Sequence, residues 1–152
     1  MASTEHVLEY ASALAELTVN SKPIISSLTI LAQEIAGGGD AAAAAAIAQL
    51  VEKHIRTSTP KVKLVGFYLL DSIVKNVKGA FVQHFQRNLA DLFLSTYQVA
   101  DGKMQESMLH LYDTWRSVFA QNVLGAIDRA LPPRQQRQKQ QQGQQGQQGQ
   151  HQ

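Results

Sequence analysis

The segment KVKLVGFYLLDSIVKNV, residues 61–77, carries the strongest fold signal in the chain. Its apolar and aromatic residues cover more than one side of a helix at the 3.6-residue period, which predicts a helix packed against neighbours on two sides. Pro60 suits the first turn of such a helix, and Ser58 or Thr59 can cap it. The sequence therefore predicts a central, largely buried helix.

A narrow polar strip interrupts this apolar helix. Asp71 and Lys75 are four residues apart and share one face, and Ser72 and Asn76 form the adjacent row. A polar strip on a buried helix typically lines a groove or holds an internal hydrogen-bond network. The strip is the main candidate for a functional site, with an ordinary helix ion pair between Asp71 and Lys75 as the alternative.

The segments on both sides of the central helix also show helical periodicity. Asn20 or Ser21 can cap the second helix and Asp40 the alanine-rich third one. The predicted helices cover residues 4–19, about 21–36, 41–56, 61–77, 80–88 as a short helix or turn, 88–99, 103–119 and 123–131. Because no segment alternates with the period of a strand, the predicted fold class is all-α, a solenoid-like stack of about eight helices.

Charge and glutamine divide the chain into two parts. All twelve acidic residues and eleven of the 14 Lys/Arg lie in residues 1–131, whereas residues 132–152 hold three Lys/Arg, no acid and twelve glutamines. Such a tail cannot bury a core, so we expect a folded domain over 1–131 and a disordered Gln-rich tail over 132–152. The folded part is not basic overall, which argues against binding duplex nucleic acid through net charge.

Several kinds of chemistry have no support in the sequence. There is no cysteine, and no histidine stands in an HExxH-type metal pattern. The phosphate-binding, dinucleotide-binding and serine-nucleophile motifs GxxxxGK[ST], GxGxxG and GxSxG do not occur. The N-terminal residues do not resemble a signal peptide, and no apolar run approaches the roughly 20 residues that span a bilayer. We therefore expect a monomeric binding domain that is not an enzyme, uses no metal or cofactor and does not bind membranes.

Four segments resemble the CTD-interacting domain (CID) of eukaryotic mRNA 3′-end processing and termination factors. They are NSKPIISSLTILAQE at 20–34, FYLLDSIVKNV at 67–77, FQRNL at 85–89 and MLHLYDTW at 108–115. The DSIVKN sequence is the most specific, and NSKPII points to the CID-bearing subunit of the pre-mRNA cleavage factor. The resemblance covers about residues 3–131 and implies a right-handed superhelix of eight helices.

The resemblance also implies a function. Such domains bind the heptad repeat YSPTSPS of the RNA polymerase II largest subunit, phosphorylated at the second-position serine, in a groove between helices two, four and seven. The protein would then act in the nucleus and couple transcription to cleavage, polyadenylation and termination. Other cleavage factor subunits would contact regions outside this chain.

By the same resemblance, Asp71 hydrogen-bonds the peptide near its tyrosine and β-turn. The implied peptide-binding residues are Asn20, Ser21, Lys22 and Ile25 on helix two, Tyr68, Asp71, Ser72, Ile73, Lys75 and Asn76 on helix four, and Met108, His110, Leu111 and Thr114 on helix seven.

His110 departs from the family pattern. Relatives that contact the phosphate directly carry Arg five residues before the tryptophan of helix seven, and here that position is His110, five before Trp115. A neutral imidazole offers one donor, whereas a guanidinium offers a charged fork. We therefore expect weak discrimination between phosphorylated and unmodified peptide.

Two alternatives remain open at this point. An ENTH- or VHS-type trafficking adaptor would share the helical stack, but its membrane-binding forms need basic residues, and the first helix carries three glutamates and no Lys/Arg before Lys22. RNA binding beside the groove is the second alternative. It would use the basic residues of segment 53–78, which are Lys53, Arg56, Lys61, Lys63, Lys75 and Lys78.

Overall fold

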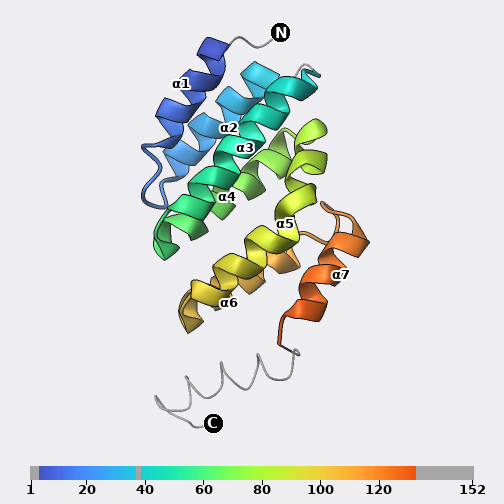
Figure 1. Cartoon of the computed structure of the whole chain (residues 1–152). Coiled ribbons are helices and arrows are strands. Elements are labelled where there is room, and N and C mark those ends of the chain that lie inside the picture. Colours follow the sequence, from blue (N-terminus) through green and yellow to red (C-terminus); the bar gives the residue numbers. More distant parts are fainter. Residues whose placement is uncertain (1–3, 37–38, 133–152) are drawn as a thin grey trace.

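The computed structural model describes residues 4–36 and 39–132, which form seven α-helices and no strand. The helices are α1 (Thr4–Leu14), α2 (Lys22–Ala36), α3 (Ala41–Thr57), α4 (Pro60–Asn76), α5 (Ala80–Val99), α6 (Gly102–Asp113) and α7 (Gln121–Ala130). They are stacked from α1 at one end of the molecule to α6 and α7 at the other (Figure 1). The all-α prediction is confirmed. Of the predicted tail, residues 133–152 lie outside the described residues.

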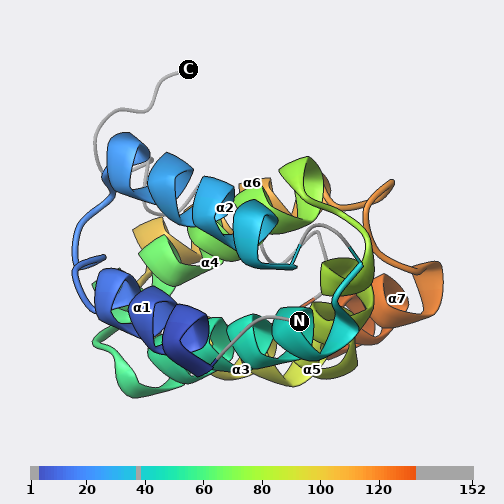
Figure 2. The ribbon, with the colours of Figure 1, turned by 90° about the horizontal axis from the view of Figure 1, so that it is seen from above.

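The helices form two layers. Figure 2 shows α2, α4 and α6 along one side and α1, α3 and α5 along the other, with α7 next to α5. α4 lies at the centre of its layer, between α2 and α6, and also packs against α3 and α5. At Gly66 an added Cβ would lie 2.5 Å from Cγ1 of Ile55, so α3 and α4 can approach closely only because this residue has no side chain. The prediction of a central helix packed on two sides is confirmed.

Aromatic side chains pack together where α4, α5 and the segment after α6 meet. Trp115 follows α6 and is fully buried. Its ring centroid lies 6.5 Å from that of Phe67 on α4, 5.8 Å from that of Phe93 on α5 and 5.4 Å from that of Phe119. Such tilted and edge-to-face ring pairs stabilise beyond the area they bury. Trp115 therefore fixes the end of α6 against α4 and α5.

Local capping signals place the helix starts where they were predicted. The Ser21 hydroxyl accepts a hydrogen bond from the Ile24 amide at 3.3 Å, and the Asp40 carboxylate accepts one from the Ala43 amide at 3.0 Å. α4 begins at Pro60 with Thr59 as its N-cap residue, although the Thr59 side chain makes no capping bond. Side-chain caps act over three residues, which is why the sequence alone locates them.

The predicted break near Asn88 is wrong, because α5 is one helix of 20 residues. Its buried residues Phe81, Phe85, Leu89 and Phe93 continue one face across the expected break. The Asn88 side chain does not cap a helix; its amide donates to the Glu52 carboxylate on α3 at 3.0 Å. A polar residue that suggested a helix start instead makes a contact between helices.

Two further helices end earlier than predicted. α1 stops at Leu14, five residues before the predicted end, and α6 stops at Asp113, since residues 114–119 form turns. In the second case the chain leaves the helix so that Trp115 and Phe119 can enter the aromatic core. The expected seventh helix corresponds to α6.

Glu52 should make stability depend on pH. It is 8% exposed, and burial raises its pKa above the usual 4.5, against the lowering effects of Asn88, Arg56 and His84. A carboxyl group with a raised folded-state pKa contributes stability that is present below about pH 4.5 and is lost as pH rises through the folded-state pKa. Glu52→Gln has no group to ionise at this position and keeps an oxygen that accepts from Asn88. The free energy of unfolding of this variant, relative to that of the wild type, should therefore be higher at pH 7 than at pH 4.

Urea unfolding of both proteins at the two pH values measures this change. Glu34→Gln, at an exposed position on α2, is the matched control and should show the same difference from wild type at both pH values. A pH-independent effect of Glu52→Gln would contradict the prediction.

Candidate functional site

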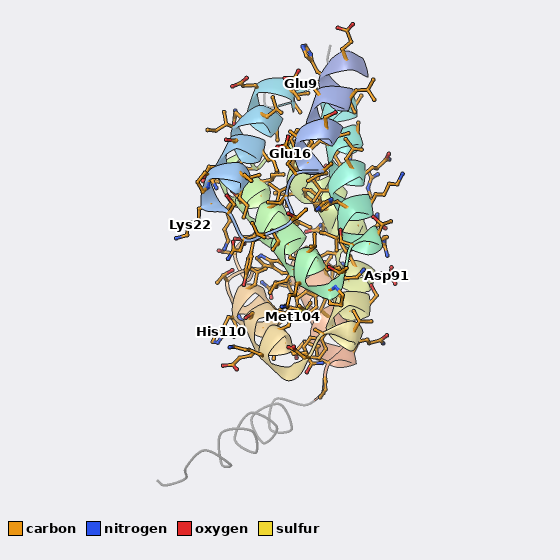
Figure 3. The ribbon with its side chains drawn as sticks, turned by 90° about the vertical axis from the view of Figure 1, so that its left-hand side faces the viewer. Glu9, Glu16, Lys22, Asp91, Met104 and His110 are labelled. Carbon is orange, nitrogen blue, oxygen red and sulfur yellow. The ribbon has the colours of Figure 1, made fainter. Side chains whose placement is uncertain are left out.

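An open pocket of about 470 Å³ lies between α4 and α6. Its walls are Tyr68, Asp71 and Lys75 of α4, Ser107, His110 and Leu111 of α6, and Thr114, which follows α6. The pocket belongs to the layer formed by α2, α4 and α6. In Figure 3, His110 on α6 and Lys22 at the start of α2 lie on the same side of the molecule.

Asp71 is held in a fixed orientation at this pocket. Its Oδ1 accepts the indole N–H of Trp115 at 2.9 Å and lies 2.7 Å from Nζ of Lys75. Within residues 4–36 and 39–132 the Asp71 carboxylate has no hydrogen-bond or ion-pair partner other than Trp115 and Lys75, and both of these contacts are made by Oδ1. The side chain is 19% exposed. One carboxylate oxygen therefore anchors the side chain, and the other is available to accept a hydrogen bond from a ligand.

Lys75 joins the two walls of the pocket. Besides the ion pair with Asp71, its ammonium group donates to the Thr114 hydroxyl at 2.9 Å, and that hydroxyl donates to the carbonyl of Leu111 at 2.7 Å. The ion pair between Asp71 and Lys75, which was the alternative interpretation of the strip, is present, and the same two residues line an open pocket. The ion pair therefore forms part of the pocket wall.

Ser72 and Asn76, in the row of α4 next to Asp71 and Lys75, form hydrogen bonds within the protein. The Ser72 hydroxyl is 2.7 Å from that of Thr29, which donates to the carbonyl of Ile25 on α2 at 2.8 Å. The Asn76 amide donates to the carbonyl of Ser72 at 2.8 Å. The Ser72–Thr29 bond connects α4 to α2, whereas the bonds of Thr29 and Asn76 to backbone carbonyls lie within their own helices.

Several predicted site residues do not line the pocket. Ile73 and Met108 are fully buried, and Ile25 is 9% exposed, so their side chains support the surface from inside. Asn20, Ser21 and Lys22 lie at the start of α2, where Ser21 is the helix cap. Only Tyr68, Asp71, Lys75, His110, Leu111 and Thr114 of the predicted set meet at the pocket.

Two residues of the site were not predicted. Ser107 lies one turn before His110 and Leu111 and shares their face, so helical spacing could have identified it. Trp115 orients Asp71 from 44 residues away, and no local pattern indicates that pairing.

The basic residues of segment 53–78 do not act as one surface. Arg56 pairs with Asp91 at 3.1 Å, and Lys75 pairs with Asp71. Lys63 donates to the carbonyls of Ile55 and Arg56 at the end of α3, and desolvation, with Arg56 as a second cause, lowers its pKa. Three of the six cations are therefore engaged within the protein, which weakens the case for RNA binding through this segment.

No helix in the described part of the chain is long and apolar enough to cross a membrane. The same described residues contain no group of three or more His, Cys, Asp or Glu side chains that could hold a metal ion.

Comparison with known proteins gives consistent matches. The CID domain family matches residues 10–127. Protein PCF11 of Saccharomyces cerevisiae is 38% identical over 109 residues, which are 72% of this chain and 17% of that protein. Polyadenylation and cleavage factor homolog 11 of Caenorhabditis elegans is 34% identical over 111 residues, 72% of this chain and 13% of that protein.

A solved structure, described as the crystal structure of the rpr of pcf11, matches with a TM-score of 0.74 and 33% identity. The match covers 81% of this chain and 95% of that one. The chain spans only 13–20% of the length of the first three curated relatives that it matches.

Proposed function

The chain belongs to the CID domain family, and from this we propose that it binds the heptad-repeat C-terminal domain of the RNA polymerase II largest subunit, phosphorylated at the second-position serine. One relative is named polyadenylation and cleavage factor homolog 11, and on this basis we extend the proposal to coupling transcription with mRNA 3′-end cleavage, polyadenylation and termination in the nucleus. On this proposal the chain is a binding module without enzymatic activity, its domain covers residues 1–131, and other cleavage factor subunits contact regions outside it.

The observation that carries the proposal is the geometry of Asp71. Its Oδ1 is held by Trp115 and Lys75, and its Oδ2 is available at an open pocket. A donor from the turn of a bound heptad can reach Oδ2, and a charge-assisted bond of this kind is stronger than a neutral one. Because the carboxylate is already oriented, binding costs little side-chain entropy. Tyr68 and Leu111 offer the apolar surface that the tyrosine and proline rings of the repeat require.

The surroundings of His110 support weak phosphate discrimination. The imidazole is 77% exposed and its Nε2 lies 3.9 Å from Oε1 of Glu106. An imidazole with one N–H donor, beside the Glu106 carboxylate, is a poor phosphate ligand, because the carboxylate repels the phosphate dianion. We expect the phosphorylated repeat to bind less than about 30-fold tighter than the unmodified one, a difference under about 2 kcal/mol.

Titration of fluorescent two-repeat peptides tests the proposed function. Peptides without phosphate and with one phosphate at each serine position are compared by anisotropy, with a scrambled sequence as the control. Saturable binding of the repeats and none of the scrambled peptide is expected. Equal binding of the scrambled peptide would overturn the function, and a preference above 30-fold would overturn only the weak discrimination.

His110→Arg should tighten binding of the second-serine phosphopeptide roughly fivefold, about 1 kcal/mol, and leave the unmodified peptide unchanged, because a guanidinium can form a charged pair with phosphate. Gln98→Arg adds the same charge at an exposed position of α5, outside the pocket, and should change neither affinity. An equal gain in both variants would mean that only long-range charge acts.

A further inference from the structure

A second pocket, of about 270 Å³, lies between α1 and α2 and shares no residue with the first. Most of its wall is apolar, formed by Ala13 of α1 and by Pro23, Ile24, Leu28 and Leu31 of α2. Ile30, which is 57% exposed, extends the apolar surface along α2. The volume suits one or two large apolar side chains rather than a whole small-molecule ligand.

Carboxylates border this pocket. Glu9 lies one turn before Ala13 on α1, and Glu16, in the turn that follows α1, is part of the pocket wall. Figure 3 labels Glu9 on α1 and Glu16 just beyond the end of this helix, with α2 beside α1. Glu34 lies on the same face of α2 as Ser27 and Leu31, one turn after Leu31.

These carboxylates lack counter-charges. Glu5, Glu9, Glu16 and Glu34 are exposed, and none has an ion-pair partner among the described residues. The one Lys or Arg in residues 4–36 is Lys22. Residues 4–36 therefore carry four acidic side chains against one Lys or Arg, and one of the four, Glu16, is in the pocket wall.

We propose that this pocket docks a short basic amphipathic peptide segment of a partner protein. One or two of its large aliphatic or aromatic side chains fill the pocket, and its Lys/Arg residues face the glutamates. An apolar groove with an acidic rim suits an amphipathic helix whose anchors are spaced by three or four residues. Complementary charge adds specificity and faster association.

Two other occupants fit this surface less well. An anionic membrane is repelled by the four glutamates. The chain's own residues 133–152 carry three Lys/Arg but no Leu, Ile, Val, Met, Phe, Tyr or Trp side chain to fill the pocket. The two pockets share no lining residue, so a segment in this pocket would not fill the pocket at Asp71.

The docking proposal can be tested with a model peptide as the probe. This is a capped 14-residue peptide of Lys, Ala and Leu with leucines at positions 4, 8 and 11. Backbone amide shifts of the full chain are followed by NMR at 150 mM salt. We expect saturable shifts centred on Ala13, Ser27 and Leu31, with a Kd on the order of 100 μM, and clearly weaker binding at 500 mM salt.

Matched variants locate the site. Ser27→Arg places a long cation at an exposed position in the pocket wall and should weaken the probe at least tenfold, as should Glu16→Lys. Glu106→Lys makes the same charge change as Glu16→Lys on α6 and should alter probe affinity less than twofold. Ser27→Arg should also leave heptad-repeat binding unchanged, so that this test and the test of the proposed function can fail separately.

Several results would overturn the docking proposal. They are an absence of saturable shifts, shifts that persist in Ser27→Arg, and equal binding of a peptide with Glu in place of Lys. Self-association of the chain through this face, or binding of the chain to phosphatidylserine vesicles that Ser27→Arg removes, would assign the pocket to a different occupant.

Discussion

Replacing Asp71 by alanine should weaken binding of the heptad-repeat peptide roughly 10- to 150-fold, which corresponds to about 1.5–3 kcal/mol. The variant loses the charged acceptor Oδ2 at the pocket and the orienting contacts of Oδ1 with Trp115 and Lys75. Peptide anisotropy measures the loss, and circular dichroism checks that the domain remains folded.

Asp71→Asn is the sharper control, because it separates the two oxygens of the carboxylate. The asparagine side chain keeps a carbonyl oxygen for the Trp115 indole and puts an amide donor in place of Oδ2. Its stability should fall by no more than about 1 kcal/mol, the value of an exposed ion pair, while its peptide affinity falls as in the alanine variant. Wild-type affinity in Asp71→Asn would show that the carboxylate serves the fold and not the ligand.

Trp115→Ala should reduce the free energy of unfolding by about 3–5 kcal/mol, since it leaves a cavity among Phe67, Phe93 and Phe119. Trp115 is fully buried, so the lost contacts are not replaced by water. The measurement is urea unfolding followed by circular dichroism. A loss below about 1 kcal/mol would contradict the central place of this ring in the core.

Trp115→Phe separates packing from orientation of the site. Phenylalanine fills much of the cavity but has no N–H for Asp71 Oδ1. We expect a smaller stability loss, about 1–2 kcal/mol, together with weaker peptide binding, because the carboxylate is no longer held. Unchanged binding in this variant would mean that Lys75 alone orients Asp71.

The sequence alone determined the features that depend on neighbours within one or two turns of a helix. These include the central helix, a cap at Asn20 or Ser21 and another at Asp40, and the ion pair between Asp71 and Lys75 as one of two interpretations of the polar strip. The resemblance to the CID family also depends on short motifs, and the family match confirmed it. Each of these features is encoded by spacings of three or four residues, which can be read without knowing the fold.

The tertiary structure decided everything that joins distant segments. Asp71 meets Trp115 across 44 residues, Ser72 meets Thr29 across 43, and Glu52 meets Asn88 across 36. The same contacts explain why α5 continues through Asn88 and why the chain leaves α6 before Trp115. Local periodicity shows which face of a helix is buried, but the partner of each side chain depends on how the helices pack together.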